Sequence, residues 1–417
     1  MEHKRQIWSA MEPYTHKKMG RILVLTGARQ VGKTTLVRKK FDDYEYISIE
    51  DPAMRYQLAS LPANQWKALH PMSVLDEVQK EASLIESVKS TYDQYDDVRY
   101  VLLGSSQILL LKKIRESLAG RCLIFTLQPL VMPELQTSSW DDELQESLWQ
   151  LTLSSGYDPD KLLPFFMLDK RYQEKTKAWN HYVKFGAYPA LTDETMDDED
   201  RYRWLESYVQ TYLERDVRDL VALRDLEPYM KLQRALALRT GSLLNASALA
   251  SEIGVSSKTV KQYIEYLNIS YQTIVLSSWE RNREKRLVKT PKIHCIDNGV
   301  LQAVLRKRGG MTGNEFESLV VSEIYKQTQN MQKPASFYHL RTHDGLEVDM
   351  LVELPEGYYA FEIKMSEHVS ATDSRHLRNL QDILDKPILH SFILSNDNQT
   401  HRISDKITAV NAAYFLG

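Results

Sequence analysis

A run of glycine, lysine and threonine residues near the N-terminus has the spacing of a phosphate-binding loop. Gly27 and Gly32 belong to a Gly-x-x-x-x-Gly-Lys-Thr pattern that ends in Lys33 and Thr34, and apolar residues 22–25 precede it. In such a strand–loop–helix unit the backbone N–H groups face phosphate oxygens, the lysine reaches the β- and γ-phosphates, and the threonine hydroxyl holds Mg²⁺. The pattern predicts a site for ATP with Mg²⁺. The predicted contacts are Gly27, Ala28, Arg29, Gln30, Val31, Gly32, Lys33, Thr34 and Thr35.

Two acidic residues end a second short apolar run. Residues 71–75 read Pro-Met-Ser-Val-Leu and lead directly into Asp76 and Glu77. The carboxyl ends of parallel strands meet at one edge of a sheet, where α/β proteins bind their ligands. We expect Asp76 to hold Mg²⁺ through water and Glu77 to orient and deprotonate the attacking water, while Lys33 stabilises the transferred phosphate. The alternative for this acidic pair is a solvated loop.

A third apolar run, residues 100–103, ends in Gly104 and Ser105. The Ser105 hydroxyl is predicted to lie beside the γ-phosphate, and a plain turn is the alternative. Phosphoryl transfer also gains from an arginine supplied to the γ-phosphate. Arg121 is the candidate for this role, supplied by a second copy of the chain, and Arg215 is the next. An ordinary ion pair is the alternative for each arginine.

The order of these motifs resembles the AAA-type branch of P-loop ATPases. More narrowly, the chain is similar to a large prokaryotic family that joins such an ATPase to a C-terminal domain of unknown function. The motifs that carry this resemblance are residues 25–35, 75–79, 103–106, 116–121, 185–189 and 212–216, and only residues 136–180 have no counterpart. The resemblance implies an AAA-type ATPase core at the N-terminus.

The last hundred residues contain a second group of residues that could do chemistry. Residues 347–352 and 358–364 alternate as two strands joined by a turn, which places Asp349 on one strand and puts Glu362 and Lys364 on one face of the other. Two carboxylates and an amine in this arrangement can hold a divalent metal and stabilise a phosphodiester undergoing cleavage. The trio is similar to the core of restriction-endonuclease-like nucleases, and Glu317 matches an additional acidic residue of that fold. A fold without activity is the alternative.

Between these regions, residues 246–267 have the pattern of a helix-turn-helix, with a turn at Gly254. A wing is expected from residue 274 onward, and its cations could neutralise phosphates of DNA or RNA. Those cations are Arg281, Arg283, Lys285, Arg286, Lys289 and Lys292. A winged helix that serves as a lid or docks a protein is the alternative.

Composition restricts the remaining choices. The chain has 417 residues and a net charge of −3, so binding to nucleic acid would need a local basic patch. Two cysteines, Cys122 and Cys295, are too few for a disulfide framework, and no apolar run approaches the roughly 18 residues of a membrane span. We therefore expect a cytoplasmic protein without membrane contact.

Together these features predict an α/β protein of several domains. The expected parts are an AAA-type P-loop ATPase domain (1–135), a helical region (136–225), a winged-helix-like domain (226–300) and a restriction-endonuclease-like α/β domain (301–417). We expect ATP hydrolysis coupled to a nucleic-acid transaction, with nuclease activity left open. The alternative is a nucleotide-dependent switch or scaffold that acts through a second copy of the chain or another protein, with an inactive C-terminal domain.

Overall fold

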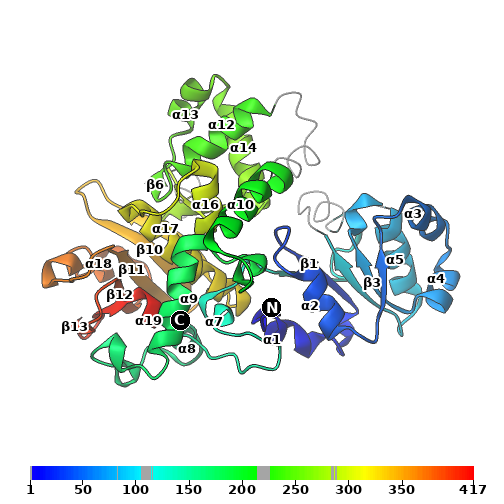
Figure 1. Cartoon of the computed structure of the whole chain (residues 1–417), viewed down its shortest axis with the longest axis horizontal. Coiled ribbons are helices and arrows are strands. Elements are labelled where there is room, and N and C mark those ends of the chain that lie inside the picture. The colour runs from blue at the N-terminus through cyan, green and yellow to red at the C-terminus, as the bar shows by residue number, and fades with distance from the viewer. Residues whose placement is uncertain are drawn as a thin grey trace.

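The computed structural model describes residues 2–81, 83–104, 114, 116–213, 226–282, 286 and 289–417. The N-terminal part is built on a parallel sheet with strand order β2-β3-β4-β1-β5, and it lies at one end of the molecule (Figure 1). Its strands are β1 (Ile22–Thr26), β2 (Glu45–Ser48), β3 (Met72–Asp76), β4 (Arg99–Leu103) and β5 (Leu123–Thr126). Its helices include α1 (Ile7–Met11), α2 (Lys33–Lys40), α3 (Pro52–Ala59), α4 (Ala63–Leu69) and α5 (Ser83–Gln94).

Strand β1 is apolar along its length because both faces of this sheet are covered. Leu23 and Leu25 pack in one core with Val37 of α2, whereas Ile22 and Val24 pack in another core with residues of α5. A parallel sheet buried on both sides needs such continuous apolar strands. The strands predicted at residues 22–25, 71–75 and 100–103 are all present, and their carboxyl ends share one edge.

The middle of the chain is mainly helical. Its helices are α7 (Met132–Leu135), α8 (Leu148–Ser155), α9 (Tyr172–Phe185), α10 (Asp198–Tyr208), the π-helix η7 (Val209–Leu213), α12 (Glu227–Ala237), α13 (Ala246–Ile253), α14 (Ser257–Ile269) and α16 (Asn298–Leu305). Gly254 has a φ of 80° between α13 and α14, and the Ser256 hydroxyl accepts a hydrogen bond from the Thr259 N–H, so that it caps α14. This helix–turn–helix arrangement agrees with the sequence pattern.

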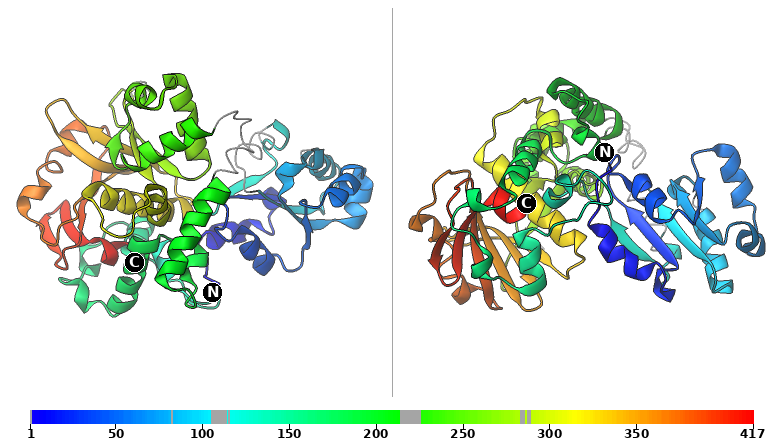
Figure 2. Two further views of the ribbon diagram at one scale, coloured as in Figure 1. Left: turned by 45° about the horizontal axis from the view of Figure 1, so that its top comes forward. Right: turned by 60° about the horizontal axis from the view of Figure 1, so that its bottom comes forward.

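A nine-stranded mixed sheet, with strand order β13-β14-β12-β11-β10-β9-β7-β8-β6, forms the other end of the molecule (Figure 2). Its strands are β6 (Ser242–Leu243), β7 (Thr273–Ser278), β8 (Lys292–Cys295), β9 (Ser336–Arg341), β10 (Glu347–Leu354), β11 (Gly357–Ile363), β12 (Ile388–Ser395), β13 (His401–Ser404) and β14 (Ile407–Asn411). Helices α17 (Gly313–Asn330), α18 (Leu380–Ile383) and α19 (Ala412–Leu416) complete this end.

This sheet crosses the domain boundary expected at residue 300. Strand β7 of the helix-turn-helix region pairs in parallel with β9, and helix α16 spans the boundary itself. Pairing β7 with β9 satisfies backbone groups that would otherwise form two open sheet edges. The winged-helix-like region and the C-terminal region therefore share one sheet.

The N-terminal domain shares a core with the middle region. Leu25 and Val31 from the ATPase side pack in one cluster with Tyr188, Tyr208 and Tyr271. The ring of Tyr208 also stacks on that of Trp204, with centroids 5.2 Å apart, which extends this core along α10.

Candidate functional site

The loop between β1 and α2 has the backbone of a phosphate cradle. Gly27 has a φ of 141° and Gly32 a φ of 92°, values that favour glycine. A Cβ atom at Gly27 would lie 2.2 Å from the Leu127 carbonyl oxygen. The loop then enters α2 at Lys33, so the first helical N–H groups face the loop. This geometry suits the binding of phosphate oxygens.

Lys33, Thr34 and Asp76 come together at the end of this loop. The Lys33 ammonium donates hydrogen bonds to the carbonyl oxygens of Gly27, at 2.9 Å, and Ala28, at 2.7 Å. The Thr34 hydroxyl donates to Asp76 Oδ2 at 2.9 Å, and the Tyr46 hydroxyl donates to the same oxygen. A hydroxyl and a carboxylate oxygen are the ligands that Mg²⁺ prefers, so these residues fit the ATP-bound metal predicted for them.

Glu77 directly follows β3 in a left-handed conformation, with φ 59° and ψ 35°. This conformation is uncommon for a residue other than glycine, and such residues cluster at functional sites. The Gln79 side-chain amide donates to the Glu77 carboxylate. Ser105, predicted beside the γ-phosphate, and Arg215 lie outside the described residues.

Arg121 lies far from the phosphate loop of its own chain. It precedes β5 and forms a bidentate ion pair with Asp93 at the end of α5. The Nε to Oδ1 distance is 2.8 Å and the Nη2 to Oδ2 distance is 3.0 Å. Both residues sit at the amino edge of the parallel sheet, whereas the phosphate loop follows the carboxyl edge. The hydrogen bond from Arg121 lowers the pKa of Asp93. Within one chain, Arg121 and the phosphate loop therefore lie at opposite edges of the sheet.

Three residues far away in the sequence contact the phosphate loop or the strand that leads into it. Arg5 donates to the Val31 carbonyl oxygen at 2.5 Å, and Tyr208 donates to that of Arg29 at 3.3 Å. The Tyr271 hydroxyl donates to Thr26 Oγ1 at 2.9 Å. No sequence motif marks these supporting residues, because each is a single polar side chain outside any pattern.

Arg5 also connects the loop to the segment that leaves the ATPase domain. Its guanidinium pairs with the Glu134 carboxylate at 3.1 Å, and both side chains are buried. Burial raises the pKa of Glu134 and lowers that of Arg5. Gln6 N donates to the other Glu134 oxygen at 2.7 Å, which satisfies the carboxylate. A buried pair of this kind is strongly destabilised when one partner is lost.

The same segment is bound by α17 of the C-terminal region. The Glu323 carboxylate accepts a hydrogen bond from Met132 N at 2.6 Å, and the Lys326 ammonium donates to the Leu130 carbonyl oxygen at 3.0 Å. Glu323 and Lys326 pair with each other at 3.0 Å and are fully buried. Residues 130–134 thus connect the phosphate loop to α17 through buried polar contacts.

The acidic residues predicted in the C-terminal region lie near one another, with Lys292 of β8 between them. The Lys292 ammonium is 2.5 Å from Glu317 Oε1, 3.4 Å from Asp349 Oδ1 and 3.6 Å from Glu347 Oε1. On β11, Glu362 pairs instead with Lys364 at 2.7 Å, as the strand alternation predicted. Asp349 Oδ2 accepts a hydrogen bond from Ile363 N at 2.8 Å, which ties the two strands together.

Burial and mutual repulsion shift the pKa values of these groups. Burial, reinforced by Asp349, raises the pKa of Glu317 to about 8 and that of Glu362 to about 7. Burial alone would lower the pKa of Lys292, yet Asp349 and Glu317 outweigh it and raise this pKa. The raised pKa values of the two glutamates and of Lys292 have a common explanation. Several carboxylates share one charged ammonium, and one carboxyl group keeps its proton.

The carboxylates of this cluster are paired with ammonium groups. Within the described ranges, no three His, Cys, Asp or Glu side chains are grouped so that they could hold a metal ion. The Lys292 ammonium lies where the oxygens of Glu317 and Asp349 converge, and Lys364 pairs with Glu362. The metal site at Glu317, Asp349 and Glu362, with Lys364 beside it, stays a prediction.

Among the described residues of the expected wing, two of the basic side chains are buried and a third forms an ion pair. Arg286 is buried against Glu353, at 3.3 Å, and Lys292 is buried in the acidic cluster. Lys289 pairs with Glu280 at 2.5 Å. Arg283 and Lys285 lie outside the described residues. Arg286 and Lys292 are therefore not available to neutralise phosphates in this structure, because both are buried against carboxylates of the C-terminal region.

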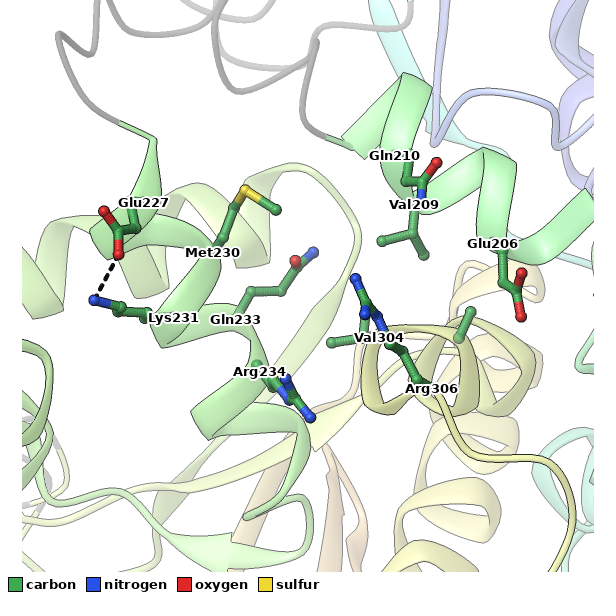
Figure 3. A pocket seen from close by; sticks show the side chains of 11 residues that line it. Glu206, Val209, Gln210, Glu227, Met230, Lys231, Gln233, Arg234, Val304 and Arg306 are labelled. Atoms are coloured by element: carbon green, nitrogen blue, oxygen red, sulfur yellow. Dashed lines mark ion pairs between the residues drawn. The ribbon is translucent and has the colours of Figure 1, made fainter. Parts of the chain in front are cut away.

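A pocket of about 800 Å³ lies between α12, α16 and the π-helix η7 (Figure 3). Its lining includes Glu206, Met230, Arg234, Val304 and Arg306. None of the nucleotide or acidic-cluster residues lines it. This pocket is therefore separate from both sites described above.

Comparisons with known proteins give a class to the N-terminal domain. Residues 19–136 match the family model described as an AAA domain. Residues 176–309 and 312–415 match two domains of unknown function, DUF8612 and DUF4143. Taken with the phosphate loop and the Thr34–Asp76 contact, the first match identifies the N-terminal domain as a P-loop ATPase domain of the AAA type.

Two curated relatives resemble the whole chain. The uncharacterized proteins Mb2031c of Mycobacterium bovis and Rv2008c of Mycobacterium tuberculosis are each 26% identical over 406 residues, which cover 95% of this chain and 81% of the relative. A similar solved structure is the Walker-type ATPase PABY2304 of Pyrococcus abyssi, with a TM-score of 0.44 and 15% identity over 71% of this chain and 95% of that one. In the part of the chain that the structure describes, no helix is long and apolar enough to cross a membrane.

Proposed function

We propose that the protein hydrolyses ATP and that the nucleotide state is transmitted to its C-terminal region as a conformational switch. The observation that carries this proposal is the buried polar connection from the Val31 carbonyl through Arg5 and Glu134 to the segment held by α17. A change in the phosphate loop alters the position of the Val31 carbonyl. Because packed cores move between discrete arrangements, this change can reach α17.

The residues at the loop have separate roles in the proposed hydrolysis. Lys33 leaves the carbonyl oxygens of Gly27 and Ala28 and pairs with the β- and γ-phosphates. Thr34 and Asp76, which are hydrogen-bonded to each other, would hold Mg²⁺, and the metal would neutralise charge on the phosphates. Glu77 orients and deprotonates the attacking water from its position after β3.

Two variants test hydrolysis and the switch together. Lys33→Ala should lose ATP binding, whereas Glu77→Gln should bind ATP and lose turnover. In the Glu77→Gln protein, ATP should change amide hydrogen exchange in residues 130–134 and in α17, and in Lys33→Ala it should change neither. Hydrolysis at the normal rate in both variants would refute the site, and unchanged exchange with ATP bound to Glu77→Gln would refute the switch.

Arg121 can complete the site only if two chains associate. Mixing Arg121→Ala with Glu77→Gln chains should then restore part of the lost ATPase activity, because a mixed pair has one intact site. The control is a mixture of Lys33→Ala and Glu77→Gln chains, which should recover no activity, because both changes lie on the phosphate-loop side and a mixed pair has no intact site. A monomer in light scattering and no recovery would assign Arg121 to its ion pair with Asp93 alone.

Contact with DNA or RNA is the second candidate function, and helix α14 favours it. Lys258, Lys261 and Gln262 are exposed on α14, although Glu265 opposes them. If α14 binds phosphates, the double variant Lys258→Glu/Lys261→Glu should weaken DNA or RNA binding and reduce its dependence on salt. Lys231→Glu/Arg234→Glu on α12 is a charge-matched control, because both of its positions are exposed and it changes the charge by the same amount. If the wild type, the double variant and the control bind DNA or RNA equally, and salt does not change this binding, nucleic-acid contact through α14 is excluded.

The finer fold assignments also remain proposals. The antiparallel β7–β8 pair after α14 supports a winged helix, and Glu317, Asp349, Glu362 and Lys364 on α17 and the β10–β11 hairpin support a restriction-endonuclease-like fold. We propose the four expected domain ranges as well, with the last two sharing one sheet.

We also propose a cytoplasmic location for the protein, which the free thiols of Cys122 and Cys295 support.

A further inference from the structure

The most unusual side chain in the C-terminal cluster comes from outside the region that supplies its acids. Lys292 lies on β8, in the helix-turn-helix part of the chain, and its side chain is 4% exposed. It reaches Glu317 on α17 and Asp349 on β10, and Glu347 lies at its outer side. Strand β8 places His294 on the same face, and His294 is fully buried as well. The strand therefore delivers one ammonium into an acidic interior.

The number of acids exceeds what an ordinary buried pair requires. One carboxylate suffices to compensate one ammonium, yet Glu317, Asp349 and Glu347 all lie within 4 Å of Lys292. Glu362 is 4% exposed, and among the described residues its Oε2 atom has no hydrogen-bond partner. An unpartnered buried carboxylate oxygen is costly, and a cation is the partner it would normally find.

We infer that Lys292 is a built-in counter-cation that takes the place of a divalent metal and keeps the acidic cluster closed to one. With Lys292 in place, the domain neither binds a divalent metal at Glu317, Asp349 and Glu362 nor cleaves phosphodiesters there. Without the ammonium, the oxygens of Glu317 and Asp349 that now contact it face one another across the space it left, and a divalent cation would relieve their repulsion, with Glu362 as a further ligand in our proposal. This inference is independent of ATP hydrolysis.

Removing only the charge tests the inference. Lys292→Met keeps the length and apolar stem of the side chain, and Lys289→Met removes a more exposed lysine of the same segment as a control. Mn²⁺ binding is measured on the full chain without ATP, by the paramagnetic signal of free Mn²⁺. Lys292→Met should gain one Mn²⁺ site that Lys289→Met and the wild type lack, and Lys292→Met/Glu362→Gln should lose it. Mn²⁺ should also raise the melting temperature of Lys292→Met and leave that of the wild type unchanged.

Three results would overturn the inference. One is a wild-type Mn²⁺ site that disappears on Glu362→Gln, since the cluster would then be open with Lys292 present. Another is folded Lys292→Met protein, judged by circular dichroism, that gains no site. If Lys292→Met does not fold in buffer, folding that returns on adding Mn²⁺ supports the inference, and failure to fold with Mn²⁺ overturns it.

Discussion

Lys33 and Lys292 belong to two sites that each combine a lysine with acidic side chains, and the acids Asp76 and Asp349 have different partners in the two sites. Lys33 donates to backbone carbonyl oxygens of its own loop, and the nearby Asp76 accepts from the neutral hydroxyls of Thr34 and Tyr46. Lys292 is instead neutralised directly by Glu317 and Asp349. Neutral partners can be exchanged for phosphates and a metal at low cost, whereas breaking a buried ion pair exposes both charges. The same residue types thus make an open ligand site in one region and a closed cluster in the other.

The largest expected effect is a loss of folding stability when Arg5 is changed. Arg5 contacts the phosphate loop but is not one of the predicted ATP-binding residues. Arg5→Met should destabilise the protein by about 3–5 kcal/mol, because it leaves Glu134 buried without its partner. Urea unfolding measures the loss. The double variant Arg5→Met/Glu134→Met should recover much of it, since no buried charge remains unpaired. A loss as large in the double variant as in the single one would mean that packing, not the ion pair, makes the contribution.

A second measurement separates the two lysines directly. At an ATP concentration about one hundred times Kd, with Mg²⁺, binding should stabilise the wild type by about 2.7 kcal/mol. Lys33→Ala should show no such stabilisation, and Lys292→Met should show all of it, because Lys292 belongs to the other region. If ATP no longer stabilises the Lys292→Met protein, the acidic cluster and the phosphate loop are energetically coupled.

The smallest expected effect comes from Tyr271, which contacts the strand leading into the phosphate loop. Tyr271→Phe removes one hydrogen bond to Thr26, while the Thr26 hydroxyl keeps its 3.1 Å contact with that of Thr126. The expected loss in unfolding free energy is about 0.5–1.5 kcal/mol. ATP affinity should change little, because the hydrogen bond that is lost goes to Thr26 at the end of β1, before the loop that binds phosphate. A large change in affinity would add Tyr271 to the nucleotide site.

Local patterns predicted the parts of the fold that are continuous in sequence. The phosphate loop, β3 with Asp76 and Glu77, helices α13 and α14, and the β10–β11 hairpin lie where the spacing of apolar and turn residues predicted them. The boundary of α10 is less evident from the sequence, because its first turn, Asp198 to Asp200, is acidic like the segment before it, and acids are favoured both in a first turn and in solvent. Patterns of this kind fail mainly at the ends of elements.

The sequence by itself determined that the chain contains an AAA-type phosphate loop and that Glu362 and Lys364 share one strand face, because both depend only on neighbouring residues. Only the tertiary structure decided what compensates each charge. Arg5 and Glu134 are separated by 129 positions in the sequence, and Lys292 and Asp349 by 57 positions. Alternation along β8 puts Lys292 on the face of the buried His294, which hints that it points inward. The identity of its partners depends on β7 pairing with β9, and no local pattern encodes a contact between strands so far apart in the chain.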